Sequence, residues 1–464
     1  MSIEYLGLSA INGPLIVLEG VRDASFDEIV ELTVEGNKKK LGRIIELYED
    51  KAVIQVFQGT EDMSLFNTHT KLTGHPMEVN LSPDILGRVF NGVGEPIDGL
   101  TNIIAETKRD INGQPLNPCS REYPRNYIKT GISSIDCLTT LIRGQKLPIF
   151  SGNGLPHDQL AAQIVKQASL GEGTNDEFAI VFAAMGVKHD VADYFRRTFE
   201  DSGASSHVVM YLNLANDPVV ERLITPKVAL TAAEYLAFEK GMHILVILTD
   251  MTSYAEAMRE VSSSKGEIPS RKGYPGYLYS ELATLYERAG IVKGCPGSVT
   301  QIPILTMPND DITHPIPDLT GYITEGQIVL DRTLSQKGIY PPINILPSLS
   351  RLMKDGIGKG FTREDHQDLA NQLFSSYARV GDARALSSVI GEDELSPIDK
   401  KYLKLGIAME QIFIAQGMEE DRSILETLDK GWEMLTILPK EELDRIDTKI
   451  LDQYYTKAKE ATDE

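Results

Sequence analysis

The sequence has few cysteines and no long apolar run. Its three cysteines, Cys119, Cys137 and Cys295, form no C-x-x-C pair, which predicts small buried residues rather than disulfides or a metal site. Apolar runs such as ILVIL at 244–248 are far shorter than the roughly 18 residues that a membrane-spanning helix needs. The stretch MSIEYLGLSAING lacks the basic and apolar regions of a signal peptide. We therefore expect a soluble cytoplasmic protein.

Basic residues are also scarce. The 464-residue chain contains 46 Lys and Arg against 67 Asp and Glu, a formal net charge of −21. Such an acidic surface repels the phosphates of nucleic acids and anionic lipid headgroups. We therefore expect neither nucleic-acid binding nor direct membrane insertion. The length and the ordinary apolar content of 42% allow two or three domains with substantial cores.

Short apolar runs separated by turn residues fill the N-terminal part of the chain. Between residues 1 and 75 they are PLIVLEGV, EIVELTV, LGRIIELYED and KAVIQVFQG, each rich in Val, Ile and Leu. Strands of this length and spacing predict a small β-barrel or sandwich. The pattern supports five or six such strands, and six would close a barrel.

From residue 76 to 351, continuous apolar runs alternate with amphipathic segments. KLPIF, FAIVFAAM, HVVMYLNLA, HILVILTD and IPILTMP are typical of parallel strands covered on both faces. VADYFRRTFEDSG and PKVALTAAEYLAFEKG are predicted helices, the second ending at Gly241. This alternation predicts an α/β domain with a mostly parallel sheet.

Residues 352–464 are predicted to form a C-terminal helical bundle. The segment SPIDKKYLKLGIAMEQIFIAQG has Ser396 as N-cap, Pro397 at the first helical position and Gly417 as its predicted end. ILETLDKGWEMLTIL and KEELDRIDTKILDQYYTKAKE continue the helical pattern. We find no internal repeats and no low-complexity linkers, so the three predicted domains should pack closely.

One strand of the central domain runs into a glycine loop and then a helix, which is the arrangement of a nucleotide-binding loop. The stretch LPIFSGNGLPHDQLAAQI, residues 147–164, has this order, with Gly152 and Gly154 in the loop. Against the phosphate-binding pattern G-x-x-x-x-G-K-[ST], Ser151 takes the place of the first glycine. The second glycine, the lysine and the serine or threonine are replaced by Pro156, His157 and Asp158.

Each of these replacements weakens phosphate binding. Pro156 removes an N–H donor and the conformational freedom of glycine. His157 is shorter than lysine and mostly neutral at pH 7, and Asp158 brings a carboxylate to the place of the phosphates. From these residues alone, an ordinary strand-to-helix turn, a degenerate nucleotide site and a working site all remain open.

The sequence offers one candidate Mg²⁺ ligand and no convincing catalytic base. Asp250 ends the run HILVILTD, where phosphoryl-transfer ATPases carry a Walker B aspartate. The alternative is an aspartate that caps the next turn. The run FAIVFAAMG leads into Val187, Lys188 and His189 without a carboxylate, and Asp190 fits the start of the next helix. No pair of histidines has the i, i+4 spacing of a helical metal site, so no metal ligand is predicted.

Six longer motifs follow one another along the chain. They are LGRVFNGVGEPIDG (86–99), TGISSID (130–136), SGNGLPHDQLAAQI, LTAAEYLAFEKGMHILVILTDMTSYAEAMRE, DDITHPIPDLTGYITEGQI (310–328) and LPSLSRLMKDGIG. In this order they resemble the B subunits of the V/A-type rotary ATPases, and the length is closer to that of bacterial or archaeal members. The resemblance covers nearly the whole chain and implies a P-loop, RecA-like α/β core between a barrel and a helical domain.

The resemblance also implies a role. In that family three non-catalytic B subunits alternate with three catalytic A subunits in a hexameric ring. Central and peripheral stalks couple ATP turnover to H⁺ or Na⁺ movement, with the ring on the cytoplasmic side of the membrane. The catalytic A subunits would hold ATP or ADP with Mg²⁺ at the interface, and this chain would bind no nucleotide tightly and would not be catalytic alone. Arg351, in LPSLSR, would be an arginine finger that reaches the neighbour's γ-phosphate.

Two other functions remain open at this point. A self-sufficient P-loop ATPase would use the unusual loop itself. A hexameric nucleic-acid translocase would share the core, but the charge of −21 and the lack of a basic, aromatic surface for single strands argue against it.

Overall fold

The computed structural model describes residues 4–34, 36, 38–113, 115–171 and 176–463. The chain forms two compact units, each built from separate stretches of sequence. In the described part, no helix combines the length and apolar character that crossing a bilayer requires. The domain boundaries predicted at residues 75 and 351 stay predictions. The first unit comprises Met1–Cys119, Ala179–Arg288 and Cys295–Gly297, and the second Ser120–Phe178, Ala289–Gly294 and Ser298–Glu464.

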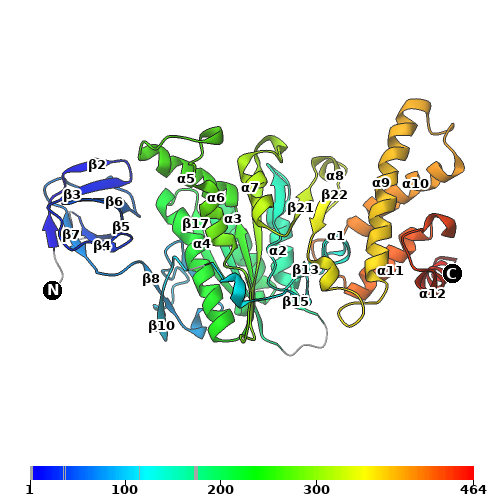
Figure 1. Ribbon diagram of the computed structural model, residues 1–464, viewed down its shortest axis with the longest axis horizontal. Helices are drawn as coiled ribbons and strands as arrows, with labels where there is room; N and C mark the ends of the chain where they lie inside the picture. Colours follow the sequence, from blue (N-terminus) through cyan, green and yellow to red (C-terminus); the bar gives the residue numbers. More distant parts are fainter. Residues whose placement is uncertain (1–3, 35, 37, 114, 172–175, 464) are drawn as a thin grey trace. The chain divides into compact units, whose positions relative to one another are not determined.

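The first unit begins with the predicted N-terminal β-barrel domain, drawn in blue in Figure 1. Its seven strands, against the five or six predicted, are ordered β1-β7-β4-β5-β6-β3-β2, and neighbours are antiparallel. Side chains such as Ile16, Val30 and Ile54 are fully buried inside it, because alternate residues of a strand face the same side. The strands are β1 Glu4–Leu6, β2 Ala10–Asn12, β3 Leu15–Glu19, β4 Ile29–Thr33, β5 Lys39–Tyr48, β6 Lys51–Val56 and β7 His69–Leu72.

The rest of the first unit is part of the central α/β domain. Its main strands are ordered β18-β16-β17-β9, and β17 lies parallel to both β16 and β9. β8 and β10 form a separate antiparallel pair. The elements are β8 Glu78–Leu81, β9 Val89–Asn91, β10 Thr107–Asp110, β16 Phe178–Val187, α3 His189–Asp201, β17 Val208–Leu214, α4 Val219–Glu234, β18 His243–Thr249, α5 Met251–Ser264 and α6 Leu278–Tyr286.

The helix predicted from residue 226 begins seven residues earlier, at Val219. Pro226 therefore lies inside α4, where its missing N–H removes one intrahelical hydrogen bond. The helix continues because most of its residues are buried, and a π-helical turn, Tyr235–Glu239, follows it. Gly241 comes just after this turn with a φ of 80°, as a helix-ending glycine should.

The second unit contains the other strands of the α/β domain. β14 lies parallel to its neighbours β20 and β21, and β22 is antiparallel to β21. The elements are β11 Arg121–Glu122, β12 Tyr127–Lys129, α1 Ser133–Leu138, β13 Leu141–Ile142, β14 Ile149–Gly152, α2 His157–Gln167, β15 Ser169–Leu170, β19 Gly290–Val292, β20 Ser298–Met307, α7 Pro315–Ile323, β21 Gly326–Leu330, α8 Arg332–Gln336 and β22 Ile343–Ser350.

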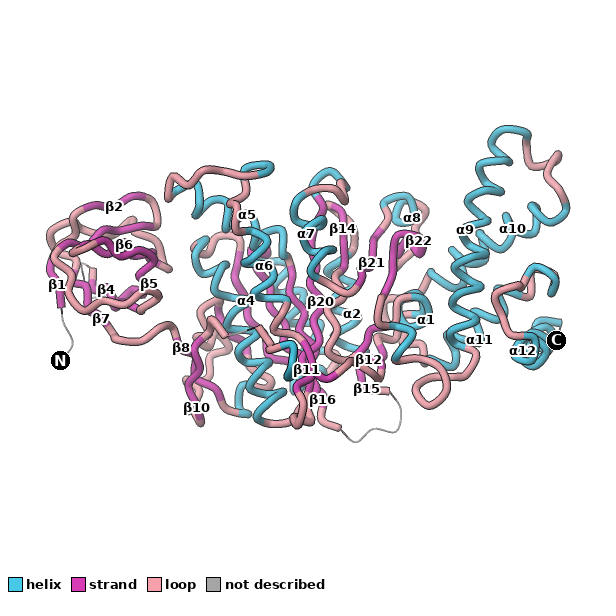
Figure 2. The backbone as a smooth tube through the Cα atoms, viewed as in Figure 1, coloured by secondary structure: helices cyan, strands magenta, loops and turns pink. Residues whose placement is uncertain are grey.

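The C-terminal part of the second unit is helical, as Figure 2 shows by its cyan tubes. Its apolar core includes Phe413 and the buried Trp432. Its helices are α9 His366–Ile390, α10 Pro397–Ala408, a π-helical stretch Met409–Ile414, α11 Ile424–Leu435 and α12 Thr448–Asp463. Among the elements that the structure describes, 3₁₀ turns occupy Pro83–Ile85, Pro118–Ser120, Ala204–His207, Arg271–Gly273, Pro308–Asp310, Met353–Asp355 and Lys440–Glu442.

Two local predictions in this part have different outcomes. Ser396 caps α10 by accepting a hydrogen bond from Asp399 N at 3.2 Å, with Pro397 at the first helical position, as predicted. The predicted helix end at Gly417 is wrong, because the helical run ends at Ile414. The chain leaves the helix there since Gln416 N donates to a distant carbonyl oxygen at 2.6 Å.

The three cysteines, all within the described part of the chain, form no disulfides. Cys137 is buried as predicted, Cys295 is half-buried, and Cys119 is exposed, so the prediction of three buried cysteines is wrong for Cys119. Apolar surroundings raise the pKa of the buried Cys137 thiol, with smaller contributions from nearby carboxylates.

Candidate functional site

The glycine loop connects β14 to α2, as its sequence predicts. Gly154 adopts a φ of 78°, which favours glycine. Leu155 N donates to Gly152 O at 3.1 Å, and His157 N donates to Leu155 O at 2.8 Å. Pro156, at the N-cap of α2, has no N–H. Two backbone donors are thus used within the loop and a third position has none, whereas a phosphate site needs such donors directed outward.

The His157 side chain turns back toward β14. Its Nδ1 lies 3.0 Å from the hydroxyl of the fully buried Ser151 and 3.0 Å from Leu155 O. Only 15% of the side chain is exposed, and Asp158 Oδ1 lies 3.7 Å from Nε2. A phosphate-binding lysine has to extend from this position. The imidazole instead closes the loop on itself, with a carboxylate at its side.

An ion pair that sequence reasoning missed lies against the loop. Arg332 Nε and Nη2 donate to the two carboxylate oxygens of Asp310, at 2.6 and 2.9 Å, and Nη2 also donates to Asn153 O at 2.9 Å. The hydrogen bond from Arg332 lowers the pKa of Asp310. A Cβ atom on Gly152 would overlap Asp310 Oδ1, so this glycine leaves room for a carboxylate. No local pattern relates residues 310 and 332, which explains the omission.

Asp250 belongs to the first unit and follows β18 directly. It is the N-cap of α5 and accepts a hydrogen bond from Thr252 N at 2.8 Å. This contact is the one that the capping alternative predicted, and the Walker B assignment stays a prediction. Asp190 is the second residue of α3, in keeping with its predicted place at a helix start. Among the described residues, no three His, Cys, Asp or Glu side chains are grouped so that they could hold a metal ion.

Arg351 follows the last residue of β22. Its backbone N donates to Glu325 O at 2.9 Å, so the backbone is held although the residue is exposed. The guanidinium makes one long hydrogen bond, from Nη1 to Thr324 O at 3.4 Å, and forms no ion pair with any residue in the described part of the chain. Arg332, in contrast, is neutralised by Asp310. Arg351 therefore presents a permanent positive charge that can bind an external anion.

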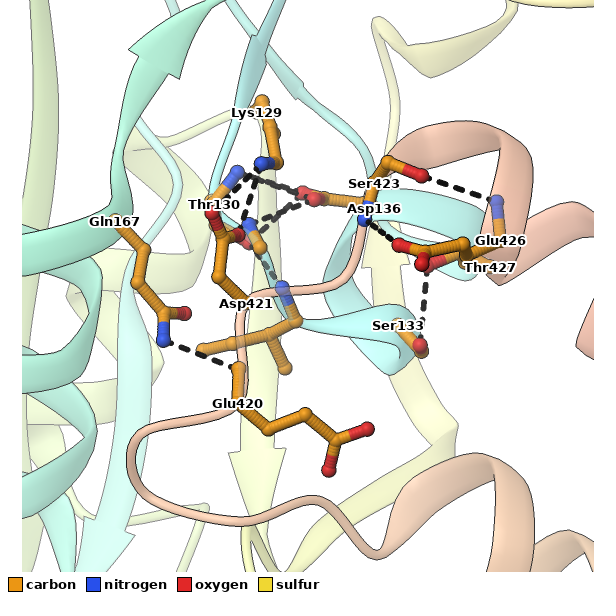
Figure 3. A network of polar contacts seen from close by, with 12 residues as sticks. Lys129, Thr130, Ser133, Asp136, Gln167, Glu420, Asp421, Ser423, Glu426 and Thr427 are labelled. Atoms are coloured by element: carbon orange, nitrogen blue, oxygen red, sulfur yellow. Dashed lines mark hydrogen bonds and ion pairs between the residues drawn. The ribbon is translucent and has the colours of Figure 1, made fainter.

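The motif TGISSID, residues 130–136, forms a buried hydrogen-bond network in the second unit, shown in Figure 3. Asp136 is fully buried and accepts hydrogen bonds from the N and Oγ1 atoms of Thr130 and from Gly131 N, at 2.7–3.1 Å. Burial raises the pKa of Asp136 to about 6, although these donors and Lys129 act in the opposite direction. These hydrogen bonds explain why an aspartate ends this motif.

The same hydrogen-bond network also holds the C-terminal segment that follows the π-helical stretch Met409–Ile414. Gln416 Nε2 and Arg422 N both donate to Gly131 O, at 2.5 and 3.1 Å. Gln167, at the end of α2, donates to Glu420 O at 3.0 Å (Figure 3). Through these contacts the helix that follows the glycine loop is tied to the C-terminal helical part. Sequence reasoning missed this function, because each bond joins residues more than 250 positions apart.

Three family profiles match consecutive parts of the chain. Residues 8–74 match the beta-barrel domain of the ATP synthase alpha/beta family, and residues 131–350 match its nucleotide-binding domain. Residues 355–455 match the C-terminal domain of V and A type ATP synthase. The three matches agree with the barrel, the α/β domain and the helical part described above.

Individual relatives are similar over nearly their full length. The chain is 63% identical to the V-type ATP synthase beta chain 2 of Clostridium tetani, over 98% of this chain and 99% of the relative. It is 63% identical to the V-type ATP synthase beta chain of Halothermothrix orenii, over 97% of each. Among solved structures, the ATP synthase subunit NeqB of Nanoarcheaum equitans superposes with a TM-score of 0.72 at 40% identity, covering 96% of this chain and 99% of that one.

Proposed function

The chain belongs to the ATP synthase alpha/beta family, among the beta (B) chains of V-type ATP synthases, and from this membership we propose that it is a non-catalytic rotary-ATPase subunit. In this proposal three copies alternate with three catalytic A subunits in a hexameric ring, in contact with central and peripheral stalks. The ring lies on the cytoplasmic side of the membrane and couples ATP hydrolysis or synthesis to H⁺ or Na⁺ movement. The A subunits hold the ATP or ADP with its Mg²⁺.

The contacts of the glycine loop support a chain that binds no nucleotide tightly. A phosphate site needs outward-facing N–H groups and a positive charge. Here Leu155 N and His157 N donate within the loop, and the His157 ring packs against Ser151. The Asp158 carboxylate lies beside the loop and would repel phosphate, and the nearby guanidinium of Arg332 is already paired with Asp310.

The single observation that carries the proposal is the state of Arg351. Its backbone is held at the end of a strand, while its guanidinium is exposed and not neutralised by a carboxylate within the described chain. A planar guanidinium can bind two phosphate oxygens at once and stabilise the charge that develops during phosphoryl transfer. Acting on a neighbouring subunit's ATP, it would make hydrolysis depend on the relative positions of the two subunits.

The test replaces Arg351 in the purified native complex. We expect Arg351→Ala to lower the rate constant of ATP hydrolysis by roughly 10³–10⁵, the range found for arginine fingers supplied in trans. Arg351→Lys should recover little of this loss, because an ammonium lacks the planar fork. Arg445→Ala is the matched control, since Arg445 is an exposed arginine of the same unit. Near-normal hydrolysis by an intact complex containing Arg351→Ala would refute the assignment.

A second measurement separates this proposal from a self-sufficient ATPase. Isothermal titration calorimetry of the purified chain with Mg²⁺ and ATP should show no micromolar binding. The reason is that the loop lacks the lysine of a phosphate site, and that Leu155 N and His157 N already donate within the loop. Micromolar binding would favour the alternative in which the loop itself holds the nucleotide.

A further inference from the structure

A buried amide lies directly beneath the backbone of Arg351. Gln145, none of which is exposed, donates from Nε2 to Ser350 Oγ at 2.8 Å and to Glu325 O at 3.2 Å. Its Oε1 accepts a hydrogen bond from Ile142 N at 2.9 Å. Arg351 N donates to the same Glu325 carbonyl oxygen at 2.9 Å. The amide group of Gln145 and the backbone of Arg351 are thus joined through one acceptor.

Ser350 completes this contact from the other side. Its hydroxyl donates to Thr140 O at 3.0 Å while it accepts from Gln145, so both of its hydrogen-bonding roles are used. Ser350 is also opposite Gly326 in the antiparallel pairing of β21 and β22. A Cβ atom on Gly326 would overlap Leu349 O, which shows how closely the two strands approach just before Arg351.

The Glu325 side chain is held by the residue next to Gln145. Its carboxylate accepts from Lys146 N at 2.8 Å and lies 2.8 Å from Lys146 Nζ. The Lys146 side chain is only 3% exposed, and Glu325 N donates back to Lys146 O at 3.1 Å. Backbone and side chain of Glu325 are therefore both held by the turn that precedes β14, the strand of the glycine loop.

We propose that Gln145 and Ser350 are positioning residues for Arg351, which they hold in the place where it reaches a neighbouring subunit's phosphate. This inference rests on the proposed function of Arg351. An exposed guanidinium acts across an interface only if its own backbone cannot drift, and a displacement of about 1 Å can cost about 10²-fold in rate. The contacts described above fix the backbone without neutralising the charge.

In this arrangement the turn before the glycine loop has the role of positioning Arg351. Gln145 lies four residues ahead of β14, and β14 pairs with β21 through Ile149 and Ile328. The turn and strands next to the glycine loop thus also hold the backbone of Arg351 in place. The loop can lose its phosphate contacts while the residues that lead into it stay necessary.

The test measures ATP hydrolysis by the native complex with Ser350→Ala in every copy of this chain. Ser350 is half-buried and its replacement leaves no large cavity, so the variant should assemble. We expect kcat to fall about ten- to a hundredfold while KM for ATP changes little, since position matters most in the transition state. Ser348→Ala is the matched control. Ser348 lies on the same strand and also makes two hydrogen bonds, to Asn344 O and from Val329 N, away from Gln145.

A double-variant comparison separates positioning from general stability. In the Arg351→Ala background there is no guanidinium to position, so adding Ser350→Ala should change the single-turnover rate of hydrolysis very little. A merely structural role would lower the rate by the same factor in both backgrounds, and that result would overturn the inference. Unchanged kcat in the Ser350→Ala complex would also overturn it.

Gln145→Met provides a second, more severe variant, because it removes the amide and leaves a side chain of similar length. Its loss of kcat should exceed that of Ser350→Ala and should likewise disappear when Arg351 is alanine. Failure of this inference is distinguishable from failure of the proposed function. In the first case Arg351→Ala still lowers the rate of hydrolysis by roughly 10³–10⁵, and in the second Arg351→Ala itself has little effect.

Discussion

Replacing Asp136 by alanine should destabilise the second unit strongly. The buried carboxylate accepts hydrogen bonds from the backbone N–H groups of Thr130 and Gly131 and from the Thr130 hydroxyl. The hydroxyl can rotate toward another acceptor, but the two N–H groups are fixed, and each stranded donor costs about 1–3 kcal/mol. The free energy of unfolding should therefore fall by about 2–6 kcal/mol, out of the roughly 5–15 kcal/mol that is typical of a domain.

The single tryptophan of the sequence provides the assay. Trp432 is 1% exposed, and its Nε1 donates to Asp365 at 2.6 Å, so its fluorescence reports unfolding of the helical part of the same unit. We would compare urea titrations of the purified wild-type and Asp136→Ala chains. Asp452→Ala is the control, because the exposed ion pair of Asp452 with Lys440 should contribute little. Equal urea midpoints for Asp136→Ala and Asp452→Ala would refute the reasoning.

The pH dependence separates the charge of Asp136 from its hydrogen bonds. Burial raises its pKa from the ordinary 3.8 to about 6, so between these values the native chain binds a proton that the unfolded chain does not. Its contribution to stability is therefore greatest below pH 4 and falls by about 3 kcal/mol as the pH rises to 6. Asp136→Asn should lack this slope. Urea midpoints that vary in parallel with pH for wild type and Asp136→Asn would contradict the assignment.

Three further predictions concern a buried histidine, a close approach of two strands and a half-exposed ion pair. Burial lowers the pKa of His366 from 6.5 to about 4, so its contribution to stability should fall by about 3 kcal/mol as the pH drops from 6.5 to 4, opposite in sign to that of Asp136. In the same urea titrations the stability of wild type relative to His366→Asn should fall by this amount, and a difference that does not change with pH would contradict the prediction. Gly326→Ala should lower the melting temperature and the yield of assembled complex, because its Cβ would overlap the carbonyl oxygen of Leu349; unchanged values would count against the close strand approach. Arg332→Ala should change the melting temperature little, since its ion pair with Asp310 is half exposed and such pairs contribute little; a large decrease would show that the pair supports the loop.

Periodic patterns predicted most of the fold correctly, because they depend on neighbouring residues. The four quoted runs of the N-terminal region correspond to β3–β6, and HILVILTD corresponds to β18 followed by Asp250. Ser396 and Pro397 marked a helix start through local capping chemistry. Errors arose where tertiary contacts overrode local signals. Helix α4 continues through Pro226, and the helical run before Gly417 ends early because Gln416 is bonded elsewhere.

In the candidate site, too, some residues could be found from local sequence patterns and others could not. The residue types Pro156, His157 and Asp158 predicted weakened phosphate binding, since proline has no N–H and histidine is mostly neutral at pH 7, but they left a turn, a degenerate site and a working site open. Arg351 was reached through resemblance alone, because an arginine after a proline- and serine-containing strand has no distinctive local pattern. The structure adds a physical argument, because the guanidinium lies in solvent with no carboxylate partner in the described chain.

The amino-acid order by itself therefore determined most element types, the net charge of −21 and the departure of the glycine loop from the phosphate-binding pattern. These properties follow from side chains a few positions apart. Only the tertiary structure decided which distant residues contact the glycine loop and the backbone of Arg351. The Asp310–Arg332 pair against Gly152 and the contacts of Gln145 beneath Arg351 join distant parts of the chain. Such contacts depend on strand register and packing distance, and neither can be calculated from spacing along one chain.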